Sequence, residues 1–251
     1  MGDRQEQEKD GYSAENRSRQ TLNVQLPVDE MLLEGELIVP EDLRGIVLFA
    51  HGSGSSRHSS RNQYVAGVLQ EAGIATLLFD LLSEEEEFRD RKSGLVRFNI
   101  DLLSNRLLQA ATWIVKLPQI EDVKFGFFGA STGAAAALVA ASEAGKDAAA
   151  VVSRGGRPDL TGPALSNVQA PTLLIVGGKD QTVLELNREA LSQLRCEKRL
   201  EVVPGATHLF EERGALEEVA RLARKWFERH LGRRENQIHP VKRFSDARGD
   251  L

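Results

Sequence analysis

The chain has 251 residues, of which 41% are hydrophobic, and a formal net charge of −5. This composition is typical of a soluble protein with one large core, and its mild acidity argues against nucleic-acid binding, which needs a basic face. The one cysteine, Cys196, excludes a disulfide or a thiolate zinc site within a single chain. We therefore expect a cytoplasmic protein without a metal.

The two ends of the chain differ from its middle. Residues 1–19 are polar and charged, so we expect a flexible leader and neither a secretory signal nor a membrane anchor. Residues 233–251 form a polar tail. The longest apolar run, residues 134–141, is too short to cross a bilayer. One domain over residues 20–232, with no membrane partner, is the resulting prediction.

The first structured segments indicate the edge of a sheet. Residues 21–26 alternate between apolar and polar side chains, and a second strand-like segment follows at residues 31–39. These two segments predict a pair of antiparallel strands. Residues 45–50 are different, because GIVLFA is a continuous apolar run, as expected of a strand buried on both faces.

Strand-like and helix-like segments alternate along the rest of the chain. The predicted strands are residues 74–79, 123–128, 148–152, 171–176 and 200–203, and the predicted helices are residues 61–72, 94–117, 132–143, 183–194 and 216–231. The acidic run at residues 84–87 is interpreted as a solvated loop or the start of a helix. This alternation predicts an α/β fold with a mostly parallel sheet, helices on both faces, and ligands beyond the carboxyl ends of the strands.

Ser131 lies at the junction of a predicted strand and an alanine-rich helix, in the sequence GASTG. A serine nucleophile on a sharp strand-to-helix turn needs small neighbours, which Gly129 and Gly133 supply. The helix N-terminus adds partial positive charge where an oxyanion would form. The pattern and its position together predict a catalytic serine.

A catalytic serine needs a base, and the base needs an orienting acid. In this architecture the chain order is serine, acid, histidine. Asp180 follows the predicted strand at residues 171–176, and His208 follows the strand that ends at Val203. Asp159 and Glu185 are weaker alternatives for the acid. We expect Ser131, Asp180 and His208 to meet at one edge of the sheet.

The loop after the strand at residues 45–50 reads HGSGSS. In this architecture that loop supplies one backbone N–H of an oxyanion hole, and the residue after the nucleophile supplies the other. We assign these donors to Ser53 and Thr132. Nucleotide binding is a weak alternative, because the loop lacks a P-loop lysine and has Arg57 where a dinucleotide fingerprint needs its third glycine.

With HGSGSS, GASTG, GGKD and ATH in this order, residues 21–231 resemble the α/β-hydrolase superfamily, and most of all its dienelactone hydrolase-like branch. The resemblance implies a three-layer fold around a sheet of about eight strands, no metal, no organic cofactor, and hydrolysis of esters or lactones through an acyl-enzyme. Dienelactone hydrolases proper use a cysteine nucleophile, whereas this chain has Ser131. Carboxylesterase activity on a small-molecule ester is therefore expected, and lactone specificity is not carried over.

The segment at residues 153–170 is too short for the lid domain of many relatives, so an open site without a large lid is expected. Arg154 and Arg157 follow a strand and could bind a substrate carboxylate, or could equally brace their loop. Arg57 and Arg61 invite the same idea less strongly.

The sequence leaves several alternatives open. A non-catalytic ligand-binding or scaffold protein could keep the same fold, and an acyltransferase or peptidase could use the same triad. The residues also do not distinguish a monomer from a homodimer.

Overall fold

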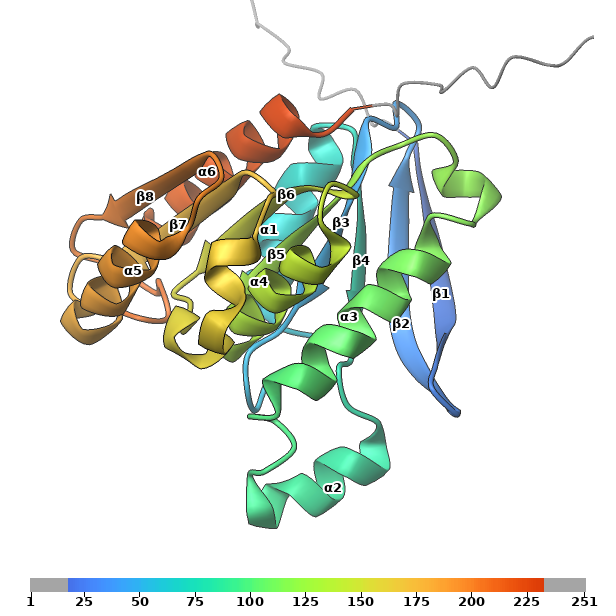
Figure 1. Ribbon diagram of the computed structural model, residues 1–251. Coiled ribbons are helices and arrows are strands. Elements are labelled where there is room, and N and C mark those ends of the chain that lie inside the picture. Colours follow the sequence, from blue (N-terminus) through green and yellow to red (C-terminus); the bar gives the residue numbers. More distant parts are fainter. Residues whose placement is uncertain (1–17, 233–251) are drawn as a thin grey trace, which may run out of the picture.

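The computed structural model describes residues 18–232, which form one eight-stranded sheet in the order β1-β2-β4-β3-β5-β6-β7-β8, with helices on both of its faces (Figure 1). The predicted tail at residues 233–251 lies outside the described residues, as does the predicted leader apart from Ser18 and Arg19. Arg19 already begins strand β1, two residues before the predicted start.

The sheet is mixed at one edge and parallel elsewhere. β1 (Arg19–Val28) pairs antiparallel with β2 (Met31–Pro40), and β2 pairs antiparallel with β4 (Ile74–Phe79). The remaining strands are parallel: β3 (Gly45–Ala50), β5 (Phe125–Ala130), β6 (Ala148–Arg154), β7 (Thr172–Gly177) and β8 (Lys198–Val203). The predicted antiparallel edge and parallel centre are confirmed.

Two helical layers cover the sheet. α1 (Ser60–Glu71) and α6 (Ala215–His230) pack on one face, and α3 (Ile100–Ile114), α4 (Thr132–Ala144) and α5 (Gln181–Gln193) on the other. The central strands are buried on both faces, which explains their continuous apolar runs. Five of the strands are parallel neighbours, so their carboxyl ends meet at one edge of the sheet: β3, β5, β6, β7 and β8.

The segment between β4 and α3 differs from the prediction. The expected helix at residues 94–117 is wrong at its start, because residues Glu84–Ser93 form a separate helix, α2, and α3 begins only at Ile100. Gly94 ends α2 with a left-handed φ of 66°. Asn99 then caps α3, since its side chain accepts a hydrogen bond from Leu102 N at 3.1 Å. The acidic run is thus the first turn of α2, where negative charge is favourable.

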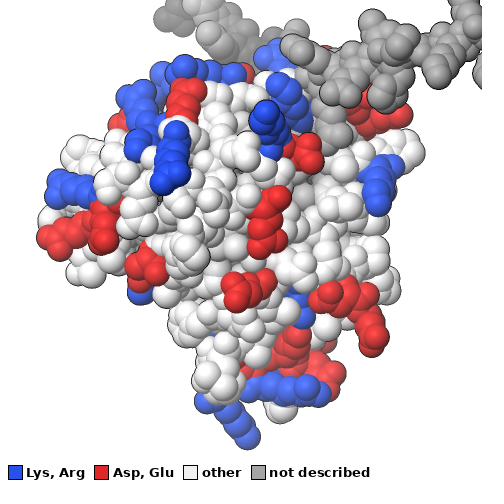
Figure 2. Space-filling model, viewed as in Figure 1, with Lys and Arg blue, Asp and Glu red and all other residues white. Residues whose placement is uncertain are grey.

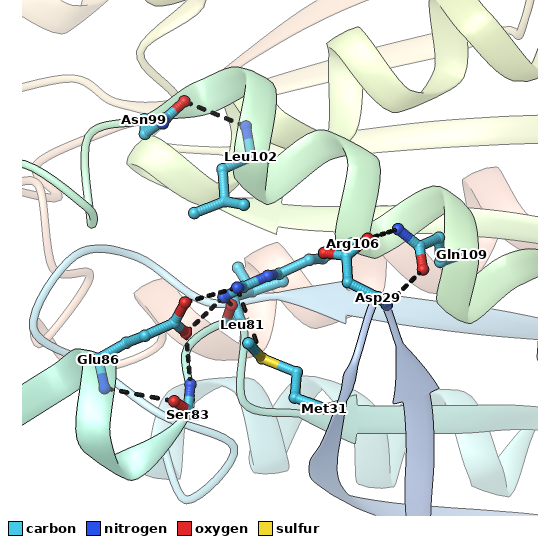
Figure 3. Close-up of polar contacts among 9 residues, drawn as sticks. All are labelled: Asp29, Met31, Leu81, Ser83, Glu86, Asn99, Leu102, Arg106 and Gln109. Carbon is cyan, nitrogen blue, oxygen red and sulfur yellow. Dashed lines mark hydrogen bonds and ion pairs between the residues drawn. The ribbon is translucent and has the colours of Figure 1, made fainter.

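Arg106 of α3 attaches α2 to the body of the protein (Figure 3). Its side chain is buried, and Nη1 donates to the Leu81 carbonyl and to Glu86 Oε2 at 2.7 Å each, while Nη2 donates to Glu86 Oε1 at 2.6 Å. Glu86 also accepts from Ser83 N at 2.9 Å in a capping box. Because Asp90 is the one buried residue of α2, this polar contact must hold much of the helix in place.

Lysine and arginine side chains are interspersed with aspartate and glutamate over the face of the molecule shown in Figure 2, with both signs present at the end formed by α2. That face therefore offers no continuous basic surface that could bind the phosphate backbone of a nucleic acid. Within residues 18–232, no helix is long and apolar enough to cross a membrane.

Replacing Arg106 with methionine should destabilise the protein by about 3 kcal/mol, because it leaves a largely buried carboxylate and a carbonyl without their donor. The free energy of unfolding from chemical denaturation measures this. Arg89→Met is the control, since Arg89 pairs with Glu85 on the exposed face of α2 and should change stability by less than about 0.5 kcal/mol. A loss below about 1 kcal/mol in Arg106→Met would contradict the proposed attachment.

The same contact should give a measurable pH dependence. Burial alone would raise the pKa of Glu86, but the hydrogen bonds from Arg106 and Ser83 outweigh it, and the pKa lies below its ordinary value. A carboxylate with a lowered folded-state pKa stabilises the protein above its unfolded pKa, near 4.5, and this stabilisation is lost as the pH falls through the folded value. The stability difference between the wild type and Glu86→Gln should therefore shrink below that pH, and a gap that is constant between pH 7 and pH 3 would refute it.

Candidate active site

Ser131 occupies a strained turn between β5 and α4, with φ 53° and ψ −119°. Its backbone is fixed from three sides: its N–H donates to the Arg154 carbonyl at 3.1 Å, and its carbonyl accepts from Ala134 N at 3.1 Å and Arg157 N at 3.2 Å. The serine side chain is therefore presented at the carboxyl edge of the sheet, as a nucleophile elbow requires.

Two glycines allow this turn to close. A Cβ on Gly129 would lie 2.4 Å from Ala134 Cα, and a Cβ on Gly133 would lie 2.3 Å from the Ala50 carbonyl oxygen. Real Cβ atoms do not approach other atoms so closely, so neither position accepts a side chain without a backbone shift. The glycines let β5, α4 and the end of β3 meet at Ser131.

Asp180 and His208 come from the ends of the next strands. Asp180 precedes α5, just beyond β7, and His208 lies in the loop that follows β8. The Nδ1 atom of His208 donates to Asp180 Oδ2 at 2.6 Å. This bond fixes the neutral ring with its proton on Nδ1, which leaves Nε2 as the basic nitrogen.

Gly155 connects this pair to the serine. A Cβ on Gly155 would lie 3.5 Å from the His208 ring, and the preceding residue, Arg154, accepts the hydrogen bond from Ser131 N. The imidazole therefore packs against the segment that also holds the Ser131 backbone. Among the described residues, no hydrogen bond joins Ser131 Oγ to His208 Nε2.

The loop after β3 lies directly against the serine, since a Cβ on Gly52 would be 3.2 Å from Ser131 Cβ. One detail differs from the sequence-based expectation. Ser53 N–H, expected to be a free oxyanion donor, donates to Thr132 Oγ1 at 2.8 Å. The two predicted oxyanion residues are thus in contact, with the Thr132 hydroxyl beside the Ser53 amide because it begins α4 and faces the loop.

His51 has a structural role. Its Nδ1 donates to the Gly52 carbonyl at 3.0 Å, and its Nε2 accepts from Leu81 N at 3.0 Å. Burial lowers the pKa of this histidine, which keeps the ring neutral. Both nitrogens are occupied, so His51 joins the loops after β3 and β4 and is not available as a base.

Two of the arginines suggested as substrate ligands are hydrogen-bonded to carboxylates. Arg57 pairs with Asp80, and its backbone N–H donates to the same carboxylate at 2.7 Å. Arg157 forms two hydrogen bonds to Asp159, at 2.8 and 2.6 Å. These pairs brace their loops, and the second also removes Asp159 as an alternative acid. Arg154 is different, because it is buried and its Nη1 has no hydrogen-bond partner among the described residues.

A cavity of about 500 Å³ lies beside the oxyanion residues. We call it the α2 cavity; its wall consists of His51 to Ser56, His58, Ser59, Leu81, Leu82, Glu87, Asp90, Arg91, Arg97, Leu103 and Thr132. The sequence analysis missed the contribution of α2. The Ser83–Glu86 capping box and Gly94 were the signals that could have revealed this helix.

Comparison with known proteins agrees with this geometry. Residues 33–232 match the model of the dienelactone hydrolase family. The chain belongs to the dienelactone hydrolase family. Its sequence is 55% identical to that of a dienelactone hydrolase from Anabaena variabilis. The two structures superpose with a TM-score of 0.83, over 85% of this chain and 99% of that one. The family match and this structure confirm the predicted α/β-hydrolase fold without a large lid.

Three further proteins are similar to this chain over most of its length. Proteins from two strains of Mycobacterium tuberculosis, each named "Putative phosphoribosyl transferase", are 58% identical over 83% of this chain and 46% of their own length. The chain thus spans about half the length of these curated relatives. Est1E from Butyrivibrio proteoclasticus, solved with ferulic acid bound, shares the fold with a TM-score of 0.71 and 16% identity, over 82% of this chain and 98% of that one.

Gly133→Ala should test the close contact at the elbow. The new Cβ would meet the Ala50 and His51 carbonyls at 2.3 and 2.4 Å, so we expect a loss of about 1–3 kcal/mol in the free energy of unfolding, as for other overpacked sites. Gly67→Ala is the matched control in α1, where a Cβ meets nothing within 4 Å and should be neutral or stabilising by up to about 1 kcal/mol. Equal effects of the two changes would contradict the contact.

Proposed function

We propose that this chain hydrolyses small carboxylic esters through an acyl-enzyme on Ser131. Ser131 Oγ attacks the ester carbonyl, and His208 Nε2 accepts the serine proton and returns it to the leaving alcohol. Asp180 holds the imidazole through the 2.6 Å hydrogen bond and stabilises its protonated form. Water, activated by the same histidine, then releases the acid and restores the serine.

The observation that supports this proposal most directly is the combination of the strained Ser131 turn with the Asp180–His208 hydrogen bond at the same sheet edge. Three groups of the right types, from the ends of β5 and β7 and the loop after β8, would not be needed together for structure alone. The strained serine backbone in particular stores a cost of about 1–3 kcal/mol that a purely structural role does not require.

Charge that develops on the carbonyl oxygen would be stabilised by Thr132 and Ser53. The Thr132 N–H lies in the first turn of α4, where no earlier residue of the helix can accept it. Because Thr132 Oγ1 accepts from Ser53 N–H, the hydroxyl keeps its own proton for donation. We therefore assign the second oxyanion donor to the Thr132 hydroxyl, which is held by the Ser53 N–H.

The α2 cavity would hold part of the substrate. Its volume of about 500 Å³ lies within the range of about 300–1,000 Å³ typical of small-ligand sites. The wall combines leucines with charged residues, and Asp90 pairs with Arg97 across it. A small ester with polar substituents fits such a wall better than a long acyl chain.

Phosphoribosyl transfer is the second candidate, and the printed name of the Mycobacterium tuberculosis proteins is its support. That name describes proteins of which this chain spans less than half the length. Hydrolysis is the stronger proposal for this chain, because it uses the groups that converge at Ser131.

Ser131→Ala should reduce kcat for p-nitrophenyl acetate and p-nitrophenyl butyrate by about 10³-fold or more, because the nucleophile is lost while the fold is kept. Steady-state kinetics measure this loss, and the melting temperature checks the fold. The control is Ser192→Ala, an exposed serine of α5 that hydrogen-bonds only within its own helix; its rate should equal the wild type. Turnover by Ser131→Ala at the wild-type rate, or no labelling of the wild type by a fluorophosphonate, would refute the proposal.

A further inference from the structure

Arg154, the last residue of β6, is the buried charge that the proposed mechanism does not use. Its side chain is 8% exposed, and within residues 18–232 its Nη1 has no hydrogen-bond partner. Buried charges in proteins are normally paired, because an unpaired charge loses its hydration without compensation. Arg57 and Arg157, which are more exposed, pair with Asp80 and Asp159, whereas the buried Arg154 has no such partner among the described residues.

A second arginine lies near the first. Arg154 is in register with Ile175, and Ile175 and Val152 belong to the core between the sheet and the helices α1 and α6, so Arg154 points to that face. Arg61, in the first turn of α1, also has a buried donor without a partner among the described residues, Nε. Two unused guanidinium donors thus come from a strand end and a helix start on the same face.

The two positive charges are poorly compensated. Burial and the proximity of Arg61 lower the pKa of Arg154 to about 10, so the group is still charged near neutral pH. Arg61 donates to Glu211 at 3.2 Å, but the Glu211 side chain is 66% exposed, and solvent screens such a carboxylate. An anion between the two guanidiniums would relieve both the missing hydrogen bonds and the repulsion.

We infer that Arg154 and Arg61 bind a phosphate group carried by the substrate of Ser131. This rests on the proposed function, because it treats the phosphate as part of the ester that Ser131 attacks. A phosphate monoester carries a charge of about −1.5 to −2 at pH 7 and three acceptor oxygens, which suits two guanidiniums. A carboxylate carries one charge and would leave one arginine uncompensated.

The position of the pair fits a substrate group. The Arg154 carbonyl accepts the Ser131 N–H, so its guanidinium begins one side chain away from the nucleophile. His58 and Ser59 line the α2 cavity, and Arg61 follows two residues later. A substrate with its ester at Ser131 and its body in the cavity can therefore direct a phosphate to this face.

Binding of inorganic phosphate at constant ionic strength tests the inference. Calorimetry on the full chain should detect phosphate binding to the wild type and to Ser131→Ala, with acetate, the singly charged carboxylate probe, binding more weakly. Arg154→Met and Arg61→Gln should each weaken phosphate binding about tenfold or more, the factor expected for loss of a charge-assisted hydrogen bond. Arg224→Gln, an α6 arginine paired with Glu228, should bind like the wild type.

The outcomes separate this inference from the proposed function. Phosphate affinity unchanged in both Arg154→Met and Arg61→Gln would overturn it, as would acetate binding as tight as phosphate. If Arg154→Met fails to fold, the partly exposed Arg61 still gives the answer through Arg61→Gln. Arginine-dependent phosphate binding to Ser131→Ala supports the site even if the wild type hydrolyses no ester, whereas ester hydrolysis without such binding supports only the proposed function.

Discussion

The close contact of three backbone segments at Ser131 is the constraint on which the rest of the site depends. The turn from β5 into α4, the end of β3 and the end of β6 meet with no room for a side chain at Gly129 or Gly133. This contact holds the serine at a φ of 53° and keeps the oxyanion loop against it. Because β3, β5, β6, β7 and β8 are parallel neighbours, every other group of the site then reaches the same edge from a strand end.

Much of this arrangement could be predicted from the sequence, because buried parallel strands leave a strong signal. A strand covered by helices on both faces must be apolar throughout, so β3, β5 and β7 stand out as short continuous runs between turn residues. Once these runs are recognised, the residues that follow them, Ser131 and Asp180, are placed at one edge by the rules of parallel sheets.

The region of α2 could not be read in the same way. α2 has one buried residue and no apolar stripe, so the periodicity that reveals amphipathic helices is missing. Its stability comes from end effects and from a tertiary contact: the capping box, the left-handed Gly94, and Arg106 reaching from α3. The error over the start of α3 has the same origin, since Gly94 closes one helix instead of opening the next.

The partners of charged side chains are a second feature that could not be predicted from the sequence. Sequence places Arg57, Arg154 and Arg157 near the carboxyl edge, yet it does not say which of them has a carboxylate within reach. In the structure Arg57 and Arg157 pair with Asp80 and Asp159, whereas Arg154 has no carboxylate partner among the described residues. Arg57 and Asp80 meet only because the loops after β3 and β4 lie against each other, and such a tertiary contact is not encoded in the local pattern.

The α2 cavity and the Arg61–Arg154 pair are two separate regions beside the Ser131 turn. The α2 cavity is bounded by a helix whose attachment is polar, and it reaches the Ser131 turn through Thr132 and the loop after β3. The Arg61–Arg154 pair lies on the face of the sheet that α1 and α6 cover, and the Arg154 carbonyl accepts the Ser131 N–H. Changes to the side chains of either region leave the Ser131 turn and the Asp180–His208 bond in place, because main-chain atoms hold the turn and the bond joins Asp180 and His208 directly. Backbone packing thus fixes the Ser131 turn, while the side chains around it can vary, which is how a single fold can carry different sites.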